Sequence, residues 1–407
     1  VTGVQTCASD LGPGCRWVGN ENGFAGATNW SFLRAGEVYP GYPKYRELQY
    51  GHADGNQWVA AECDVSIRPG WFYHPEEDNR VKTVEQLTDL YYRSVGHNAT
   101  LLLNFPVDRN GLIHPVDSAN AVDFHKNIQK QLAHNLLSGV VAEVSDERGG
   151  KYTAKAMTDN DYDTYWATND GVVSATVEFD LPQQEKVNRM MLQEYIPLGQ
   201  RVKSFVVEYN KDGQWLPVKL NEETTTVGYK RLLRFETVTT DKLRVNFTDA
   251  RACLCINNVE AYYAGETADV SFDNTVADIK SYPFTLVGVD EAEAKKCADK
   301  DDTTTCFVDG NTVVVDLGEE QTVASFHYLP DQSEYNKGLI SGYEISVGTD
   351  ANAINNVVTK GEFSNIKHNP ILQSVYFTPV KARYVMLKAV KMVNEGETMG
   401  FAEIGIR

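Results

Sequence analysis

The spacing of apolar and polar positions changes along the chain and divides it into regions of different predicted structure. Between residues 9 and 136, short apolar runs alternate with segments of helical period, an order that favours a parallel sheet covered by helices. Residues 58–61 form a buried run that ends at the polar residues 62–64, as a strand does where it reaches a pocket. Residues 101–103 form another, which ends at Asn104. We therefore expect an α/β domain here.

Two helices are predicted within this domain. The first follows Thr83, which has the spacing of a capping box with Gln86, and it ends before Gly96. The second runs from about Ser118 to Leu136. Their apolar stripes are Val84, Leu87, Tyr91 and Val95 in the first helix, and Phe124, Ile128, Leu132 and Leu136 in the second.

The length of the α/β region limits what it contains. A complete (β/α)8 barrel takes roughly 250 residues, whereas residues 9–136 provide 128. We therefore expect only the C-terminal half of a barrel. Residues 1–8 fit neither a strand nor a helix, and we interpret them as a foreign leader.

Beyond residue 137 the helical period disappears and short alternating runs take over, which is typical of β-sandwich strands. The pattern occurs twice, because in each copy an acidic loop precedes a strand and a similar segment closes the copy. We predict two all-β domains, over residues 137–265 and 266–407, the first of which packs on the barrel. The strands of the first include residues 175–179, 205–209 and 242–247, and the strand after the second acidic loop is 313–317.

Charge and composition restrict the partners. The chain has 56 Asp and Glu against 38 Lys and Arg, and its net charge of −18 argues against nucleic acid or anionic lipid. Neutral ligands fit better, and the 16 Phe, 21 Tyr and 6 Trp include rings that could stack on sugars, although most are expected in cores. No apolar run reaches the 18 or more residues of a membrane span.

The seven cysteines are too few and too scattered for a disulfide scaffold. Cys253 and Cys255 alternate along a strand-like run and are expected on opposite faces, so no zinc site is predicted. Cys297 and Cys306 flank one loop, and they either pair in an exporting cell or remain free thiols.

The acidic loops, residues 159–166 and 299–306, and the closing segments, residues 258–262 and 401–406, resemble those of discoidin-like, galactose-binding-like jelly rolls. The resemblance implies that each copy holds Ca²⁺, a cation that prefers oxygen ligands. Alternatively, the Asp and Thr side chains only cap turns. Carried over by position, the ligands would be Asp159, Asp161, Thr164 and Glu260 in the first copy, and Asp299, Asp301, Thr304 and Glu403 in the second.

The front of the chain resembles the family 29 α-L-fucosidases, in particular the branch that cleaves α-1,3/1,4-linked fucose. Four segments carry this resemblance in the same order, which are residues 9–21, 62–73, 102–106 and 192–202. It implies a retaining glycosidase that needs no cofactor for catalysis. Such an enzyme uses one carboxylate to attack the anomeric carbon and a second carboxyl group to protonate the leaving oxygen.

The resemblance implies that Glu21 is the general acid/base. Its neighbours Gly19 and Gly23 are expected to leave room for substrate and for an unusual backbone path. The nucleophile of the family is an Asp on an earlier barrel strand, and we assign no residue to it, because Asp10 lies too close in sequence. The chain is therefore expected to be truncated on its N-terminal side and inactive alone.

Four further residues are candidates for the sugar pocket. Trp71 either lies against the fucose methyl group or packs at the barrel rim, and Trp17 is a candidate for the aglycone side. Glu62 and Asp64 either bind fucose or the adjoining sugar, or support the site by pairing with Arg68 or Arg16.

These expectations lead to an exported enzyme, periplasmic or extracellular, that acts on fucosylated oligosaccharides or glycoconjugates. An export signal would have been lost with the N-terminus. One alternative is a non-catalytic carbohydrate-binding protein built on the two β-domains. The other is a retaining hydrolase that cleaves a different sugar.

Overall fold

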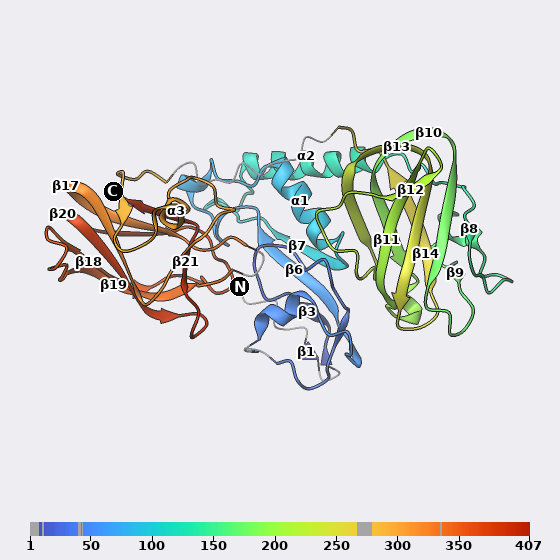
Figure 1. The fold of residues 1–407 in the computed structure, drawn as a ribbon, viewed down its shortest axis with the longest axis horizontal. Coiled ribbons are helices and arrows are strands. Elements are labelled where there is room, and N and C mark those ends of the chain that lie inside the picture. The colour runs from blue at the N-terminus through green and yellow to red at the C-terminus, as the bar shows by residue number, and fades with distance from the viewer. Residues whose placement is uncertain (1–7, 10–11, 40–41, 43, 267–278, 334–335) are drawn as a thin grey trace. The chain divides into compact units, whose positions relative to one another are not determined.

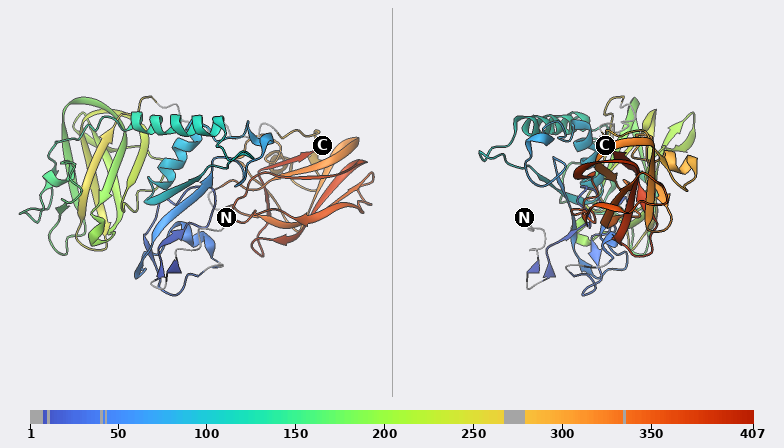
Figure 2. Two further views of the ribbon diagram at one scale, coloured as in Figure 1. Left: turned by 180° about the vertical axis from the view of Figure 1, so that it is seen from behind. Right: turned by 90° about the vertical axis from the view of Figure 1, so that its left-hand side faces the viewer.

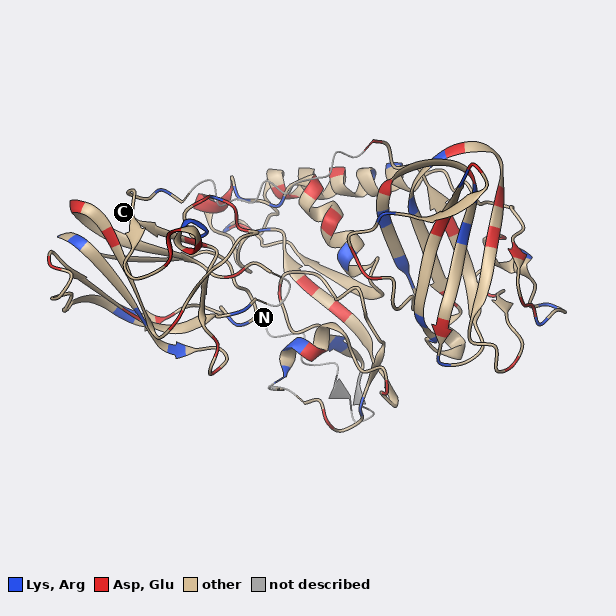
Figure 3. Cartoon of the chain, in the orientation of Figure 1, with Lys and Arg blue, Asp and Glu red and all other residues tan. Residues whose placement is uncertain are grey.

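The computed structural model describes the chain except for residues 1–7, 10–11, 40–41, 43, 267–278 and 334–335 (Figure 1). The chain divides into two compact units between Ser271 and Phe272, close to the boundary predicted after residue 265. Acidic and basic positions are interspersed along both units (Figure 3). In the described part of the chain, no helix has both the length and the apolar character to cross a membrane. Most of the expected leader lies outside the described residues.

The front of the first unit contains a parallel sheet of three strands, in the order β3-β6-β7. These are β3 (Cys15–Trp17), β6 (Ala60–Ser66) and β7 (Ala99–Asn104). Helices α1 (Val84–Ser94) and α2 (Pro115–Gln131) lie on the same side of this sheet (Figures 1 and 2). The side chains of alternate strand residues meet them there, and the shared core consists of Val65, Ile67, Leu87 and Leu90, with Leu101, Leu103 and Phe124 at its margin.

The two helices begin and end for local reasons. Thr83 accepts a hydrogen bond from the Gln86 amide, and the Gln86 side chain accepts one from the Thr83 amide, so the predicted capping box is confirmed. Helix α2 begins earlier than predicted, at Pro115. Proline is favourable there because the backbone N–H of the first helical residue has no acceptor within the helix, so its absence costs no hydrogen bond. It also ends earlier, because Leu137 turns into the core of the following sheet and is fully buried.

The expected half barrel is larger than what the described residues form. They contain three parallel strands, one fewer than half of eight. Between β3 and β6, which pair directly with each other, the chain forms only loops and short elements. These are β4 (Phe32–Leu33), β5 (Gln57–Trp58) and the 3-10 helix η2 (Tyr45–Gln49). Before β3, β1 (Ala8–Ser9) pairs with β2 (Gly12–Pro13). The 3-10 helix η3 (Pro75–Glu77) follows β6.

The rest of the first unit is one seven-stranded antiparallel sheet. Its strands are β8 (Glu143–Val144), β9 (Trp166–Ala167), β10 (Ala175–Glu194), β11 (Val202–Lys211), β12 (Gln214–Pro217), β13 (Arg231–Ala250) and β14 (Cys255–Tyr262), with 3-10 helices η4 (Ala154–Met157) and η5 (Ile196–Leu198). The long strands β10 and β13 shift register twice, after Asp180 and after Val187. Alternate residues such as Val177, Phe179 and Val245 are fully buried in its core.

The second unit has its own core and repeats this strand order. Its elements are β15 (Thr285–Leu286), α3 (Glu291–Lys295), β16 (Cys306–Val308), β17 (Thr312–Leu329), β18 (Ile340–Gly348), β19 (Asn356–Glu362), β20 (Gln373–Met392), β21 (Met399–Phe401) and β22 (Glu403–Ile406). The order β19-β18-β20-β17, with β22 and β15 both on β17, matches β12-β11-β13-β10, with β14 and β8 both on β10. The predicted internal repetition is therefore confirmed.

Within the first unit, polar side chains join the parallel sheet to the antiparallel one. The Asn29 amide donates to Thr226 Oγ1 at 2.8 Å. His97 lies 2.7 Å from a Glu222 oxygen, and Arg231 donates to the same oxygen at 2.9 Å and to the Ala27 carbonyl. Because these groups are buried or nearly so, the first antiparallel sheet and the α/β part form one body, as predicted.

Candidate active site

Glu21 lies in the loop that follows β3, at the carboxyl end of the parallel strands. The loop makes two turns with positive φ, 83° at Gly19 and 85° at Gly23, so the expected unusual backbone path is confirmed. The expected room for substrate beside these glycines is not found. A Cβ on Gly19 would lie 2.3 Å from the Tyr45 carbonyl oxygen, and one on Gly23 would lie 2.7 Å from Val65. Both glycines are therefore required by close packing within the protein.

Asn20 holds the loop that presents Glu21. Its side-chain amide donates to the Phe24 carbonyl at 3.1 Å, and its oxygen accepts from the Asn22 amide at 3.0 Å. The Asn20 residue is buried, so these bonds are largely protected from competing water. The backbone on both sides of Glu21 is thereby fixed.

Trp71 contacts Glu21 directly. Its indole nitrogen donates to Glu21 Oε2 at 2.6 Å. The Trp71 carbonyl in turn accepts from Asn104 Nδ2 at 3.1 Å, and the same nitrogen donates to Ser66 Oγ at 3.1 Å. The ends of β6 and β7 therefore hold Trp71, and Trp71 orients Glu21.

Trp17 and Asp64 form a second pair at the same edge of the sheet. The Trp17 indole donates to Asp64 Oδ1 at 2.6 Å. Asp64 is only 4% exposed. Burial raises the pKa of the Asp64 carboxyl to about 6, the Trp17 bond opposes this, and the negative charge of Glu21 adds to it. Glu62 lies opposite Trp17 in the strand register, on the same face as Asp64.

The supporting pairs considered for Glu62 and Asp64 are not formed in the described part of the chain. Arg68 binds Asp117 through two bonds of 2.8 Å and also binds Asp78. Arg16 donates to the Leu48 and Trp30 carbonyls and to Asn29. Both guanidinium groups are therefore engaged elsewhere, and Asp64 is held by Trp17 instead.

The site thus brings together all five residues predicted from the sequence: Trp17, Glu21, Glu62, Asp64 and Trp71. Chemically, it presents one carboxyl group on a rigid loop and a second, buried one beside it, both held by indole N–H donors. Sequence reasoning did not identify Asn20, Ser66 or Asn104 as positioning residues. The sequence offered two signals for them. Ser66 and Asn104 stand at strand ends, and Asn20 lies between Gly19 and Gly23.

The two acidic loops have the same hydrogen bonds at equivalent positions. Thr164 Oγ1 donates to Asp159 Oδ2 at 2.9 Å, and Thr304 Oγ1 donates to Asp299 Oδ2 at 2.9 Å. The residue after the first Asp has positive φ in both loops, 60° and 64°. The Asp161 and Asp301 amides each donate to the preceding Asp at 2.9 Å. The alternative role, in which Asp and Thr cap the turn, is therefore present in both copies.

The strand register changes the correspondence between the closing glutamates. Glu403 pairs with Leu329 on β17, and the equivalent position of β10, Gln193, pairs with Asn258. Glu260 lies two residues further on, where it accepts bonds from Tyr262 and Asn258. The positional match on which Glu260 was chosen as a calcium ligand is therefore wrong, and Asn258 is the counterpart of Glu403.

No three His, Cys, Asp or Glu side chains of the described residues gather as they would around a metal ion. Two buried amide oxygens of β14, Asn257 Oδ1 and Asn258 Oδ1, nevertheless accept no hydrogen bond within the described part of the chain. Asn257 adjoins the loop through its bond to the Tyr162 carbonyl. In the second loop, Glu403 accepts from the Lys300 amide, and burial raises its pKa to about 7.

The cysteines also depart from their predicted arrangement. Cys253 and Cys255 are not on opposite faces, because Arg201 Nη1 donates to both sulfurs, at 3.0 and 3.2 Å. The prediction was wrong because residues two positions apart in a strand share a face. Cys253 itself lies in a bend just before β14 begins. Cys297 and Cys306 are fully buried free thiols, and the Cys306 thiol raises the pKa of Cys297 through a hydrogen bond.

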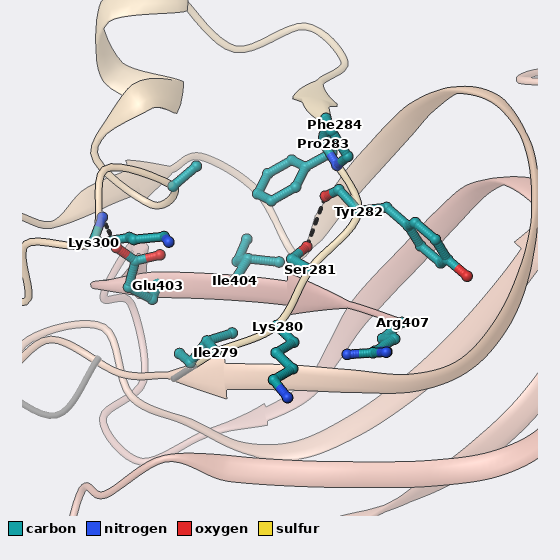
Figure 4. A pocket seen from close by; sticks show the side chains of 11 residues that line it. Ile279, Lys280, Ser281, Tyr282, Pro283, Phe284, Lys300, Glu403, Ile404 and Arg407 are labelled. Carbon is teal, nitrogen blue, oxygen red and sulfur yellow. Dashed lines mark hydrogen bonds between the residues drawn. The ribbon is translucent and has the colours of Figure 1, made fainter. Parts of the chain in front are cut away.

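A second candidate site is a cavity of about 630 Å³ in the second unit (Figure 4). Lys300 and Glu403 lie at one end of it and Tyr282 and Arg407 at the other, with the Phe284 ring between them. Lys280 adds a further cation to the lining. The cavity therefore combines an aromatic wall with charged groups that can donate to ligand oxygens.

Comparison with known proteins assigns the antiparallel parts of the chain. The profile of the F5/8 type C domain matches residues 141–257 and again residues 290–404. Together these segments make up more than half of the chain. The chain therefore belongs to the F5/8 type C domain family, of which it carries two copies.

Proteins to which this chain is similar include α-L-fucosidases. Alpha-L-fucosidase 1 of Arabidopsis thaliana is 37% identical over 237 residues, which are 56% of this chain and 45% of the relative. Among solved structures, a Ruminococcus gnavus GH29 fucosidase in complex with fucose is 34% identical with a TM-score of 0.56, covering 62% of this chain and 51% of that chain. A glycoside hydrolase 29 family member from an unknown rumen bacterium is 32% identical with a TM-score of 0.52, covering 97% and 62%.

The chain spans about half the length of the curated relatives it matches. A second plant relative, from Oryza sativa subsp. japonica, is 39% identical over 250 residues, and 47% of its length is covered.

Proposed function

We propose that the chain belongs to a retaining α-L-fucosidase in which Glu21 is the general acid/base. The observation that carries the proposal is the hydrogen bond from the Trp71 indole to Glu21, at the edge of the parallel sheet where the strands end. Barrel enzymes place their catalytic groups at this edge. The fucosidase relatives support the choice of sugar.

The chemistry of such an enzyme assigns two tasks to Glu21. As an acid it protonates the glycosidic oxygen while a carboxylate attacks the anomeric carbon, and as a base it then takes a proton from water. The two carboxyl groups of a retaining enzyme lie roughly 5 to 5.5 Å apart. We assign the attacking carboxylate to an Asp of a barrel strand outside residues 1–407, so residues 1–407 are inactive alone.

The other pocket residues then take binding roles. We place Trp71 against the fucose ring, where its indole both orients Glu21 and presents an apolar face to the methyl group. Glu62 and Asp64 accept hydrogen bonds from hydroxyl groups of fucose or the adjoining sugar, and Trp17 lines the aglycone side. The substrates are fucosylated glycans, with α-1,3/1,4 linkages as the preferred class, met in the periplasm or outside the cell.

The same proposal covers the architecture. The three-stranded parallel sheet with α1 and α2 is the C-terminal part of a (β/α)8 barrel, and the two antiparallel regions are galactose-binding-like jelly rolls. The parallel order β3-β6-β7, with both helices on one side, supports the barrel. The matching strand orders of the two units support the jelly rolls.

The test is Glu21→Gln in the complete gene product, assayed on an aryl α-L-fucoside and on Lewis-type trisaccharides. Turnover is expected to be lost, and azide is expected to restore it on the aryl substrate, because azide can replace the water that the base would activate. Glu236→Gln, an exposed glutamate on β13, is the matched control and should leave turnover unchanged. Unaltered activity of Glu21→Gln would remove the assignment.

A carbohydrate-binding role without catalysis is the second candidate, and the cavity beside Glu403 and Lys300 is the observation that favours it. It predicts binding of the chain to glycans on an array, with no release of fucose from the complete gene product. Release of a different sugar would instead favour the rival hydrolase.

We also propose that the acidic loops bind Ca²⁺. The unpartnered Asn257 and Asn258 oxygens support a site at the first loop, with Asp159, Asp161 and Thr164 as further ligands. At the second loop the ligands would be Asp299, Asp301, Thr304 and Glu403. Calcium should raise the melting temperature of the chain, and Asp159→Asn should remove part of that rise. An equal melting temperature in calcium and in chelator would exclude both sites.

A further inference from the structure

We propose that Cys253 and Cys255 form a reactive thiol pair that is oxidised to a disulfide by small organic disulfides. The proposal goes beyond the proposed glycosidase, whose chemistry uses neither cysteine. It rests on the arrangement of two arginine side chains around the two sulfurs at the start of β14.

The two sulfurs are held by one guanidinium group. Arg201 Nη1 donates to Cys253 Sγ at 3.0 Å and to Cys255 Sγ at 3.2 Å. Because both bonds end on the same nitrogen, the sulfurs cannot be further apart than the two distances added together. The Cys253 carbonyl accepts from this nitrogen as well, at 2.7 Å, so the bend that carries Cys253 is fixed against Arg201.

The two thiols differ in how solvent reaches them. Cys253 is partly exposed, and Arg148 Nη2 donates to its sulfur at 3.4 Å from the solvent side. Cys255 is buried, which raises the pKa of its thiol to about 11, although Arg201 opposes the rise. Reactive cysteines are accessible to solvent and lie in electropositive surroundings, and Cys253 meets both conditions through its exposure and its contacts with Arg148 and Arg201. Cys253 is therefore the attacking thiol and Cys255 the resolving one.

The reaction balances with a small disulfide, RSSR, as the oxidant. The Cys253 sulfur attacks one sulfur of RSSR, the S–S bond breaks, and the leaving RS⁻ takes the proton of Cys253. The Cys255 sulfur then attacks the Cys253 sulfur, and the second RS⁻ leaves with the proton of Cys255. Two thiols of the protein are oxidised and two RSH are formed. Such disulfides occur in the oxidising compartments to which exported proteins are sent.

The test follows the thiols by mass spectrometry in the full chain, reduced and then treated with oxidised glutathione. The peptide that contains both cysteines should lose two hydrogens and resist alkylation. Cys255→Ser should instead retain glutathione on Cys253, because the resolving thiol is gone. A mixed disulfide that persists on Cys253 in the unsubstituted chain would overturn the proposal.

Alkylation rates test the role of the arginines. In the reduced chain, iodoacetamide should modify Cys253 faster than the fully buried Cys63, whose pKa burial raises. Arg148→Gln should slow the reaction at Cys253 severalfold, while Lys151→Gln, which removes a neighbouring cation without a bond to sulfur, should not. Circular dichroism checks that each variant folds. Equal rates in Arg148→Gln and Lys151→Gln, with both variants folded, would contradict the role assigned to Arg148.

Discussion

At the residue scale, the candidate active site is organised by two indole N–H groups that each hold a carboxyl group. Trp71 donates to Glu21 and Trp17 donates to Asp64, both at 2.6 Å. A hydrogen bond to a charged group contributes about 1.5–3 kcal/mol, more than a bond between neutral groups. The orientation of both acids therefore depends on single nitrogen atoms, which conservative substitutions can remove.

Trp71→Phe removes the donor to Glu21 and keeps most of the aromatic surface. We expect kcat of the complete gene product on an aryl α-L-fucoside to fall about tenfold or more, because a loss of about 1.4 kcal/mol is one factor of ten. KM should change little, since the ring remains. Trp58→Phe, a partly exposed tryptophan on β5, serves as the control. An unchanged kcat in Trp71→Phe would show that the bond does not orient the acid.

Asp64 makes the stability of the first unit depend on pH. Its folded pKa of about 6 lies above the ordinary value of 3.8, so the folded chain keeps this proton where the unfolded chain has lost it. The free energy of unfolding should therefore fall as pH rises from about 4 to about 6, by at most about 3 kcal/mol. Urea unfolding at several pH values measures this fall, and Asp64→Asn should flatten it. The same slope in Asp64→Asn would assign the proton to another group.

At the scale of elements, the ends of helices and strands explain where the functional groups lie. The loop after β3 presents Glu21, the end of β6 presents Ser66, and the end of β7 presents Asn104. These strands are parallel, so their carboxyl ends meet at one edge. Helix α1 packs against β6 and β7 through Leu87 and Leu90.

Thr83→Ala removes the hydroxyl that caps α1 and leaves the Gln86 amide without its acceptor. We expect the free energy of unfolding of the first unit to fall by about 1 kcal/mol. Chemical denaturation followed by circular dichroism measures the change. Thr83→Ser, which keeps the hydroxyl, should restore most of the loss, and a failure to do so would mean that the methyl group rather than the cap is responsible.

The sequence predicted those elements whose signals are local. The capping box at Thr83, the strand at residues 101–103 and the alternating strands of both antiparallel sheets depend on neighbouring residues, and all are confirmed. The end of α2 was placed too late, because Leu136 continues the helical period but is drawn into the next core. Periodicity alone does not show whether an apolar residue continues the helix or packs into the core of the next sheet.

The sequence predicted which residues lie close together at the candidate site, but not which of them form hydrogen bonds with one another. The family resemblance selected Glu21, and positions at or just beyond a strand end selected Glu62, Asp64 and Trp71. The pairing of Trp71 with Glu21, however, joins residues that are 50 positions apart. The positional match between Glu260 and Glu403 was wrong for a related reason, since strand pairing and not distance from the end of each copy makes Asn258 the counterpart of Glu403. The opposite-face prediction for Cys253 and Cys255 was wrong because side chains two positions apart in a strand point to the same face.

At the scale of the whole molecule, the parallel sheet is the least complete part. Neither β3 nor β7 pairs with another strand on its outer side in the described part of the chain. The two antiparallel regions, by contrast, each enclose a core with many fully buried side chains. Stability and catalysis are therefore expected to depend on different parts of the chain.

Residues 1–407 alone should release no fucose from an aryl α-L-fucoside, because the proposed attacking carboxylate is not among them. The same preparation should unfold cooperatively and with the signal of β-structure, which shows that inactivity is not due to misfolding. Turnover that disappears in Glu21→Gln would mean that the chain contains both carboxylates, and the search for the second would return to Asp64.

The buried contacts of Asn29, His97 and Arg231 have a consequence for how this gene can be rearranged. Recombination that exchanged the first antiparallel sheet for another would leave these groups facing an unmatched surface, with several donors and acceptors unsatisfied. Shuffling of modules between genes should therefore be tolerated near residue 271 and selected against near residue 137.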